Sequence, residues 1–119
     1  MSKVIGIVGS RRRHSKNDFI LVEQAFLDIF TSDDIICSGK CPTGADHFAE
    51  ILATIYEVDT LFYPAKWKRH GKAASFIRNE QIAKASDVLI ACVAQDRTGG
   101  TEDTIKKYKK LGKTELILV

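Results

Sequence analysis

Several residue types are scarce in this 119-residue sequence, which has one tryptophan, one methionine, two prolines and three cysteines. An odd number of cysteines cannot pair completely, and Cys37 and Cys92 lie inside apolar, strand-like runs. We therefore expect small buried thiols rather than a disulfide scaffold. That usage suits a reducing compartment, and we expect a cytoplasmic protein.

Long apolar runs are also missing, and none approaches the roughly 20 residues that a membrane-spanning helix needs. The Met-Ser-Lys start leads into a short strand pattern rather than into a charged leader with an apolar core, so we expect neither secretion nor a membrane partner. The sequence has no internal repeat, low-complexity tract or linker-like stretch. This predicts a single domain over residues 1–119.

The composition that is present is typical of a globular protein. Apolar residues make up 45% and charged residues 28%, so the chain can bury a core. The net charge of +3 favours anionic ligands, but it is too small for the basic stripe of a dedicated nucleic-acid binder. Aromatic residues are also few, so we do not expect nucleic acid as a partner.

Short β-branched apolar runs alternate with stretches of helical periodicity, which is the pattern of βαβ units and a parallel sheet. The expected strands are 3–8, 34–37, 60–63, 87–93 and 115–119. Apolar residues at helical spacing predict four helices that face this sheet. Their stripes are Phe19, Val22, Phe26, Ile29 and Phe30; Phe48, Leu52 and Ile55; Phe76, Ile77 and Ile82, in a helix over 73–85; and Ile105, Tyr108 and Leu111.

These elements predict a doubly wound, Rossmann-like α/β fold with a five-stranded parallel sheet, strand order 3-2-1-4-5 and helices on both faces. Ligands of such folds bind where the order reverses, here between the first and fourth strands. The loops 9–14, 38–46 and 94–101 should then share one rim. Their glycines allow backbone to approach a ligand, and the helix starts offer free N–H groups to a phosphate. The Gly-x-Gly-x-x-Gly and P-loop patterns are absent, which argues against an ordinary NAD or ATP-hydrolysing site.

Six short motifs occur in one order along nearly the whole chain. They are Gly9-Ser10-Arg11, Ser38-Gly39 with Gly44-Ala45-Asp46, Pro64-Ala65-x-Trp67, His70-Gly71-Lys72-Ala73-Ala74, Arg78-Asn79 and Gly99-Gly100-Thr101. This ordered set resembles the SLOG superfamily, and specifically its small YspA-type branch, which is related to the LOG (lysine-decarboxylase-like) phosphoribohydrolases and to the DNA-processing protein DprA.

The resemblance implies a pocket for nucleotides or nucleotide-derived molecules, with some members proposed as sensors and others cleaving the N-glycosidic bond of nucleoside monophosphates. Arg78 matches the catalytic arginine of LOG enzymes, but Thr104 stands where their glutamate is expected. A hydroxyl cannot supply the charge of a carboxylate, and Glu102 or Asp103 could replace it only from a shifted loop. We therefore expect binding or sensing first, and an N-glycosidase second.

Two further expectations follow from the resemblance. Single-stranded nucleic-acid binding, by analogy with DprA, ranks third among the functions. The relatives among the LOG enzymes form dimers, which makes a homodimer possible.

The predicted ligand-binding residues combine glycines with donors on the shared rim. They are Gly9, Ser10, Arg11, Ser38, Gly39, Gly44, Trp67, Arg78, Asn79, Gly99, Gly100 and Thr101. If the protein is an enzyme, Arg78 and Glu102 are its candidate catalytic residues. No cofactor is expected, and no metal, because His70 has no nearby partner at ligand spacing.

Several of these side chains also have structural interpretations. Asp46 follows Thr43 at capping-box spacing, and we expect it to cap a helix rather than to bind ligand. We give Ser15 and Asp18 the same capping role. Trp67 could pack over the sheet edge or stack on a base.

The two acids at the start of the last helix have two open interpretations. Glu102 and Asp103 suit either of two roles, complementing the helix dipole or holding ribose hydroxyls, and the sequence leaves both open.

Overall fold

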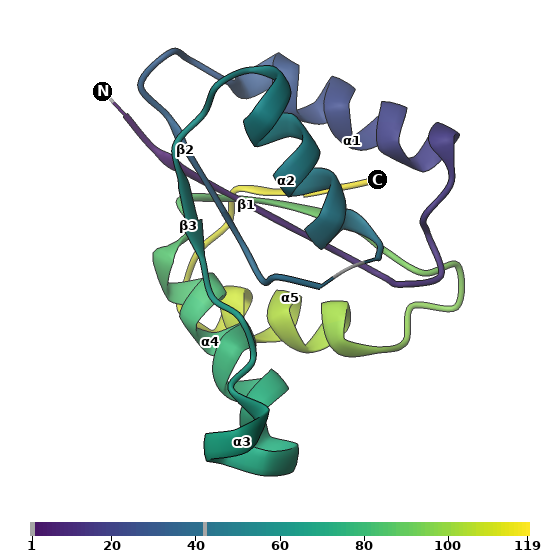
Figure 1. Ribbon diagram of the computed structural model, residues 1–119, viewed down its shortest axis with the longest axis vertical. Helices are drawn as coiled ribbons and strands as arrows, with labels where there is room; N and C mark the ends of the chain where they lie inside the picture. The colour runs from purple at the N-terminus through teal and green to yellow at the C-terminus, as the bar shows by residue number, and fades with distance from the viewer. Residues whose placement is uncertain (1, 42) are drawn as a thin grey trace.

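A computed structural model describes residues 2–41 and 43–119, and it shows a parallel sheet with the order β3-β2-β1-β4-β5 (Figure 1). This confirms the predicted doubly wound, Rossmann-like fold class and strand order. The strands are β1 (Val4–Gly9), β2 (Ile35–Ser38), β3 (Thr60–Phe62), β4 (Val88–Cys92) and β5 (Leu116–Leu118). Pro42, part of the predicted loop 38–46, lies outside the described residues.

Helices cover both faces of the sheet. One face carries α1 (Lys16–Ile29) and α2 (Ala45–Ile55), and the other carries α4 (Ala74–Ala85) and α5 (Gly100–Lys110) (Figure 1). Between β3 and α4 the chain also forms the single-turn helix α3 (Trp67–His70) and a 3-10 turn (Gly71–Ala73). Figure 1 shows that α3 protrudes from the body of the domain below α4.

The first helix starts as its sequence predicts. The Ser15 side chain accepts a hydrogen bond from the Asp18 backbone N–H at 3.1 Å, and the Asp18 carboxylate accepts one from the Ser15 N–H at 3.2 Å. This reciprocal pair satisfies two N–H groups that the helix cannot pair internally. The capping role expected for Ser15 and Asp18 is therefore confirmed.

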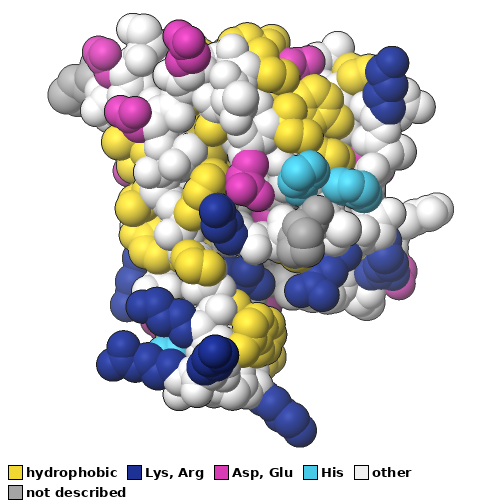
Figure 2. Space-filling view, in the orientation of Figure 1, with side chains coloured by type: hydrophobic (Ala, Val, Ile, Leu, Met, Phe, Trp, Pro, Cys, Tyr) yellow, Lys and Arg dark blue, Asp and Glu magenta, His cyan; other side chains and the backbone are white. Residues whose placement is uncertain are grey.

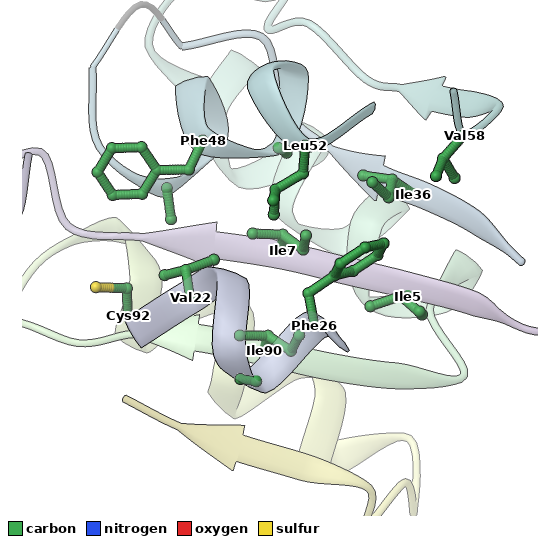
Figure 3. Close-up of a cluster of buried hydrophobic side chains, with 13 residues drawn as sticks. Ile5, Ile7, Val22, Phe26, Ile36, Phe48, Leu52, Val58, Ile90 and Cys92 are labelled. Carbon is green, nitrogen blue, oxygen red and sulfur yellow. The ribbon is translucent and has the colours of Figure 1, made fainter. Parts of the chain in front are cut away.

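The core has two layers because successive strand residues point to opposite faces. From β1, Ile5 and Ile7 pack under α1 and α2 with Phe26 (Figure 3), whereas Val8 packs on the other face with Tyr108 of α5. Each fully buried large side chain of this kind contributes about 1.5 to 3 kcal/mol to stability.

The cysteines follow the prediction. Cys37 and Cys92 are buried free thiols, and burial raises the pKa of Cys37 to about 11.

Three residues expected to face the sheet are exposed instead. Phe76 lies in the first turn of α4 and faces α5, with Lys107 Nζ 5.3 Å from its ring centroid. Ile55 is the last residue of α2 and Leu111 follows the last residue of α5, so both lie where the chain leaves the sheet. Helical periodicity identified the apolar face of each helix, but it did not reveal how far along the helix that face remains in contact with the sheet.

None of the helices in the described residues is both long and apolar enough to cross a membrane.

Candidate functional site

A cavity of about 360 Å³ lies between the loops that follow β1 and β4. Nine of the twelve predicted ligand-binding residues line it: Gly9, Ser10, Arg11, Trp67, Arg78, Asn79, Gly99, Gly100 and Thr101. Segments distant in the sequence therefore meet at the point where the strand order reverses, which is where this fold class binds ligands.

Gly9 allows these segments to come close together. A Cβ atom at this position would lie 2.5 Å from the Ala45 Cβ and 2.8 Å from the Cys92 Cβ, which is closer than real Cβ atoms approach. The next residue, Ser10, is held by its N–H, which donates to the Cys92 carbonyl at 2.9 Å. The first loop therefore starts at a fixed point beside the end of β4.

The start of α5 forms the opposite wall. Gly99 and Gly100 have open space where a Cβ would be, and α5 begins at Gly100. Unpaired backbone N–H groups and the positive end of the helix dipole occur at such a start, and both favour an anion. Thr101 lines the cavity in the same turn.

Arg78 of α4 lies at the floor of the cavity with a side chain that is only 14% exposed. Its Nη1 is 3.8 Å from Asp46 Oδ2, and its Nε donates to Asn79 Oδ1 at a long 3.3 Å. A Cβ at Gly39 would lie 2.5 Å from Nη1, so the guanidinium occupies space that the missing side chain leaves. A guanidinium has five N–H donors, and here its protein contacts are few and long.

Asp46 is the acid of the cavity lining, and its expected capping role is wrong. The N-cap of α2 is Gly44, and no side chain caps the helix. The Asp46 carboxylate instead accepts a hydrogen bond from Ser38 Oγ at 3.1 Å and faces Arg78. Burial raises the pKa of Asp46 to about 6, although Arg78 and Ser38 oppose the shift.

The three remaining predicted binding residues, Ser38, Gly39 and Gly44, lie behind the lining. Ser38 Oγ shares its single proton between Asp46 and the Ile7 carbonyl, and the contact with Ile7 joins β2 to β1. The Gly44 N–H donates to His14 Nδ1 at 2.8 Å, with φ at 76°, a conformation that favours glycine. These residues support the wall of the cavity from outside.

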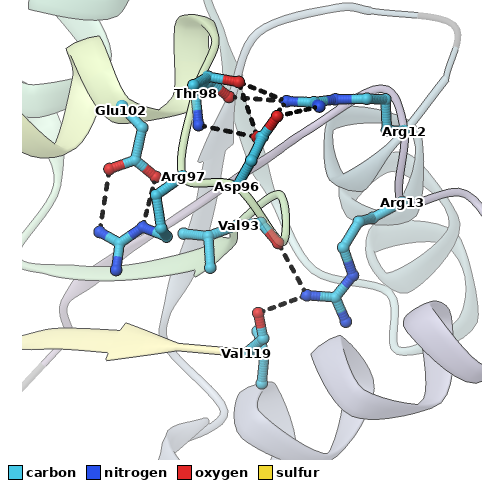
Figure 4. A network of polar contacts seen from close by, with 8 residues as sticks. All are labelled: Arg12, Arg13, Val93, Asp96, Arg97, Thr98, Glu102 and Val119. Atoms are coloured by element: carbon cyan, nitrogen blue, oxygen red, sulfur yellow. Dashed lines mark hydrogen bonds and ion pairs between the residues drawn. The ribbon is translucent and has the colours of Figure 1, made fainter.

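Arg12 joins the two loops on the rim (Figure 4). Its guanidinium pairs with both oxygens of Asp96 at 2.9 Å and with Thr98 Oγ1 at 2.8 Å. These hydrogen bonds hold the pKa of Asp96 well below its usual range. Although Arg12 lines the cavity, its donors are therefore engaged by the protein.

Two other charged residues near the rim are paired away from the cavity. Glu102, the candidate catalytic acid, accepts from Arg97 at 2.7 and 2.9 Å and does not line the cavity (Figure 4). Arg13 donates to the carbonyls of Val93 and Val119. Of the run Arg11–Arg13, Arg11 thus lines the cavity without a hydrogen bond from its side chain to any described residue.

Asn79 connects α4 to α5. Its Nδ2 donates to Asp103 Oδ2 at 3.0 Å and to the Gly100 carbonyl at 3.3 Å. Asp103 also pairs with Lys107 at 2.6 Å. The Asp103 carboxylate is thus engaged within the helix pair, while Thr104, at the expected glutamate position, is buried and lines the cavity.

Trp67 lies at the mouth of the cavity as the first residue of α3, with 53% of its surface exposed. Packing against the domain therefore covers only part of the surface of the Trp67 side chain. An exposed indole beside a cavity offers an apolar face to a planar group.

Some lining residues were not predicted as binding residues. Ser75 lies one turn before Arg78 on α4, and the helical spacing could have revealed it. Cys41 and Thr98 belong to loops whose course the sequence pattern does not fix. Within residues 2–41 and 43–119, no three His, Cys, Asp or Glu side chains are grouped so that they could hold a metal ion.

Comparisons of this chain with models of protein families, with curated proteins and with solved structures find no match.

Proposed function

We propose that the cavity binds a nucleotide or a nucleotide-derived ligand through a phosphate group. The observation that carries this proposal is the nearly buried Arg78, whose guanidinium faces the cavity and has only long contacts with the protein. Charge-assisted hydrogen bonds to a phosphate would satisfy the remaining donors.

A second feature supports an anion at the same place. Arg11 lines the cavity beside the start of α5, so a second guanidinium can approach a group bound at the helix N-terminus. Helix starts with glycines bind phosphate because backbone N–H groups converge there.

Two other lining residues suit the rest of a nucleotide. Trp67 can stack on a base at the mouth, and stacking of this kind is worth about 1 to 3 kcal/mol per base. Asp46 can accept hydrogen bonds from sugar hydroxyls or base N–H groups. The ligand class also agrees with the resemblance to the SLOG superfamily.

Calorimetry with adenosine monophosphate, adenosine and inorganic phosphate tests this function. We expect the nucleotide to bind more tightly than either of its parts. Binding should also change the fluorescence of Trp67, the single tryptophan. In Trp67→Ala we expect the affinity for the nucleotide to fall while the affinity for inorganic phosphate is kept. Equal affinities for adenosine and its monophosphate would contradict a phosphate site.

Hydrolysis of the N-glycosidic bond is the second candidate function, and Asp46 is the observation that favours it. In this reaction a water oxygen would bond to C1′ of the ribose, and the C1′–N bond would break with its electron pair on the base. Asp46 would take a proton from the water and pass it to the departing base, leaving ribose 5-phosphate. A carboxyl with a pKa of about 6 suits this transfer near neutral pH.

Release of free base from nucleoside monophosphates tests the second function. If it occurs, we expect Asp46→Asn to abolish it and Glu102→Gln to leave it unchanged, because Glu102 is paired with Arg97 outside the cavity. No release by the unmodified protein would leave binding as the function of the cavity.

A further inference from the structure

Positive charge is concentrated in one segment of the chain. Residues 60–79 contain five lysines and arginines and no aspartate or glutamate, although the net charge of the whole protein is only +3. The rest of the chain is therefore net negative. Like charges in one segment repel one another, and a bound anion would relieve that repulsion.

Most of this charge lies on the protrusion beside the cavity mouth. Lys68 and Arg69 of α3 and Lys72 of the next turn are exposed, and they follow Trp67 directly. Figure 2 shows Lys and Arg side chains gathered around the part of the molecule that Figure 1 labels α3. We call Lys68, Arg69 and Lys72 the basic arm.

The cations of the basic arm have no acidic partner among the described residues. Some lysines elsewhere have one: Lys3 pairs with Asp34 at 2.6 Å, and Lys107 pairs with Asp103 at 2.6 Å. The three side chains of the arm thus have unpaired charge, and none of them lines the cavity, whereas Trp67 does. Trp67 lines the cavity and immediately precedes Lys68 in α3, so the basic arm begins next to the cavity lining.

We propose that the natural ligand is a nucleotide with two separate phosphate groups, one bound in the cavity and one on the basic arm, with its base at Trp67. This inference rests on the proposed nucleotide site and names its ligand class. A nucleoside 3′,5′-bisphosphate and a dinucleotide with a terminal 5′-phosphate have this arrangement of charges. The arm is a single helical turn beside one exposed tryptophan, which suits a short ligand better than a long nucleic-acid strand.

The test compares adenosine 5′-monophosphate, adenosine diphosphate and adenosine 3′,5′-bisphosphate by calorimetry at fixed salt. We expect the bisphosphate to bind about tenfold more tightly than the monophosphate, since three exposed ion pairs each contribute about twofold. We expect a smaller gain for the diphosphate, because its two phosphates are adjacent.

Two triple variants with the same charge change locate the effect. The variant Lys68→Gln, Arg69→Gln and Lys72→Gln should lose the gain of the bisphosphate and keep the affinity for the monophosphate. The control variant, Lys106→Gln, Lys109→Gln and Lys110→Gln, removes three exposed lysines further along α5 and should keep both.

Several outcomes would overturn the inference. They are equal affinities for the monophosphate and the bisphosphate, an equal gain for the diphosphate, and equal losses in both triple variants. A twelve-nucleotide single strand that binds more tightly than the bisphosphate would instead assign the arm to nucleic acid. If the monophosphate does not bind at all, the proposed function itself fails, so the two failures are distinguishable.

Discussion

Two arginine–aspartate pairs border the same cavity, and they differ in geometry and burial. Arg12 and Asp96 are more than half exposed and meet through two hydrogen bonds of 2.9 Å, and the pKa of Asp96 is lowered. Arg78 and Asp46 are nearly buried but stand 3.8 Å apart, and the pKa of Asp46 is raised to about 6 by burial. In the first pair the charges satisfy each other, whereas in the second each has unused hydrogen-bonding capacity.

This difference distinguishes a charged pair that stabilises the structure from a charged pair that is available to bind a ligand. Exposed pairs contribute about 0 to 1 kcal/mol to stability, and Arg12 mainly fixes one loop against another. A buried charge without a close partner costs free energy, so a protein that has one is expected to use it. The incomplete pair is therefore the better candidate for contact with a ligand.

The largest expected effect concerns the stability of the protein as a function of pH. A carboxyl with a raised folded pKa keeps its proton in the folded state while the unfolded chain releases it, so the free energy of unfolding falls between about pH 4 and pH 6. The fall due to Asp46 should be on the order of 3 kcal/mol. The variant Asp46→Asn lacks this titration. Its free energy of unfolding, relative to that of the unmodified protein, should therefore increase as the pH rises through this range.

Denaturant unfolding at pH 4, 5, 6 and 7 measures the difference in the free energy of unfolding between Asp46→Asn and the unmodified protein. Asp96→Asn is the matched control: because the pKa of Asp96 is lowered, its titration lies mainly below pH 4, and its effect on the free energy of unfolding should stay nearly constant from pH 5 to pH 7. If the free energy of unfolding of Asp46→Asn differs from that of the unmodified protein by the same amount at every pH, the pKa of Asp46 is not raised. Arg78 and Asp46 would then form a complete pair.

The second prediction concerns ligand affinity. Arg78→Ala should weaken binding of adenosine monophosphate about tenfold to a hundredfold, since a charge-assisted hydrogen bond is worth about 1.5 to 3 kcal/mol. Gly39→Ala should have a similar effect, because its Cβ would displace Nη1 of Arg78. Unchanged affinity in both variants, with the fold intact by circular dichroism, would remove Arg78 from the site.

The smallest expected effect belongs to Arg12. Arg12→Ala breaks hydrogen bonds to Asp96 and Thr98 that are exposed and screened by solvent, so the stability of the protein should fall only slightly. Nucleotide affinity should fall less than fivefold, through a looser rim rather than a lost ligand contact. A loss as large as that of Arg78→Ala, measured by the same titration, would erase the distinction between the pairs.

Much of the fold could be predicted because its signals are local. The alternation in β1 directs Ile5 and Ile7 to one face and Val8 to the other, and Ser15 with Asp18 identifies the start of α1. Handedness and strand order then brought the loops after β1 and β4 together. Phe76 was misplaced, since helical spacing does not reveal which neighbour covers a side chain.

The candidate site was only partly predictable. Glycine-containing loops and Arg78 were found from sequence motifs, but Asp46 was assigned to a cap from its spacing after Thr43. Glu102 was a candidate acid until the structure placed it against Arg97. Spacing in the sequence identifies which residues can interact within one helix. Long side chains such as these also interact with residues of neighbouring elements, and spacing does not reveal those partners.

The sequence by itself determined the parallel sheet, the strand order and the rim on which the loops meet, because periodicity and chain chirality act over short stretches. Only the tertiary structure decided that Arg12 is closely paired, whereas Arg78 has only long contacts with Asp46 and Asn79. That outcome depends on the loop from 94 to 101 folding toward Arg12, and on Gly39, distant in the sequence, leaving space for Arg78. Distances between residues so far apart follow from packing of the whole domain, which no local pattern encodes.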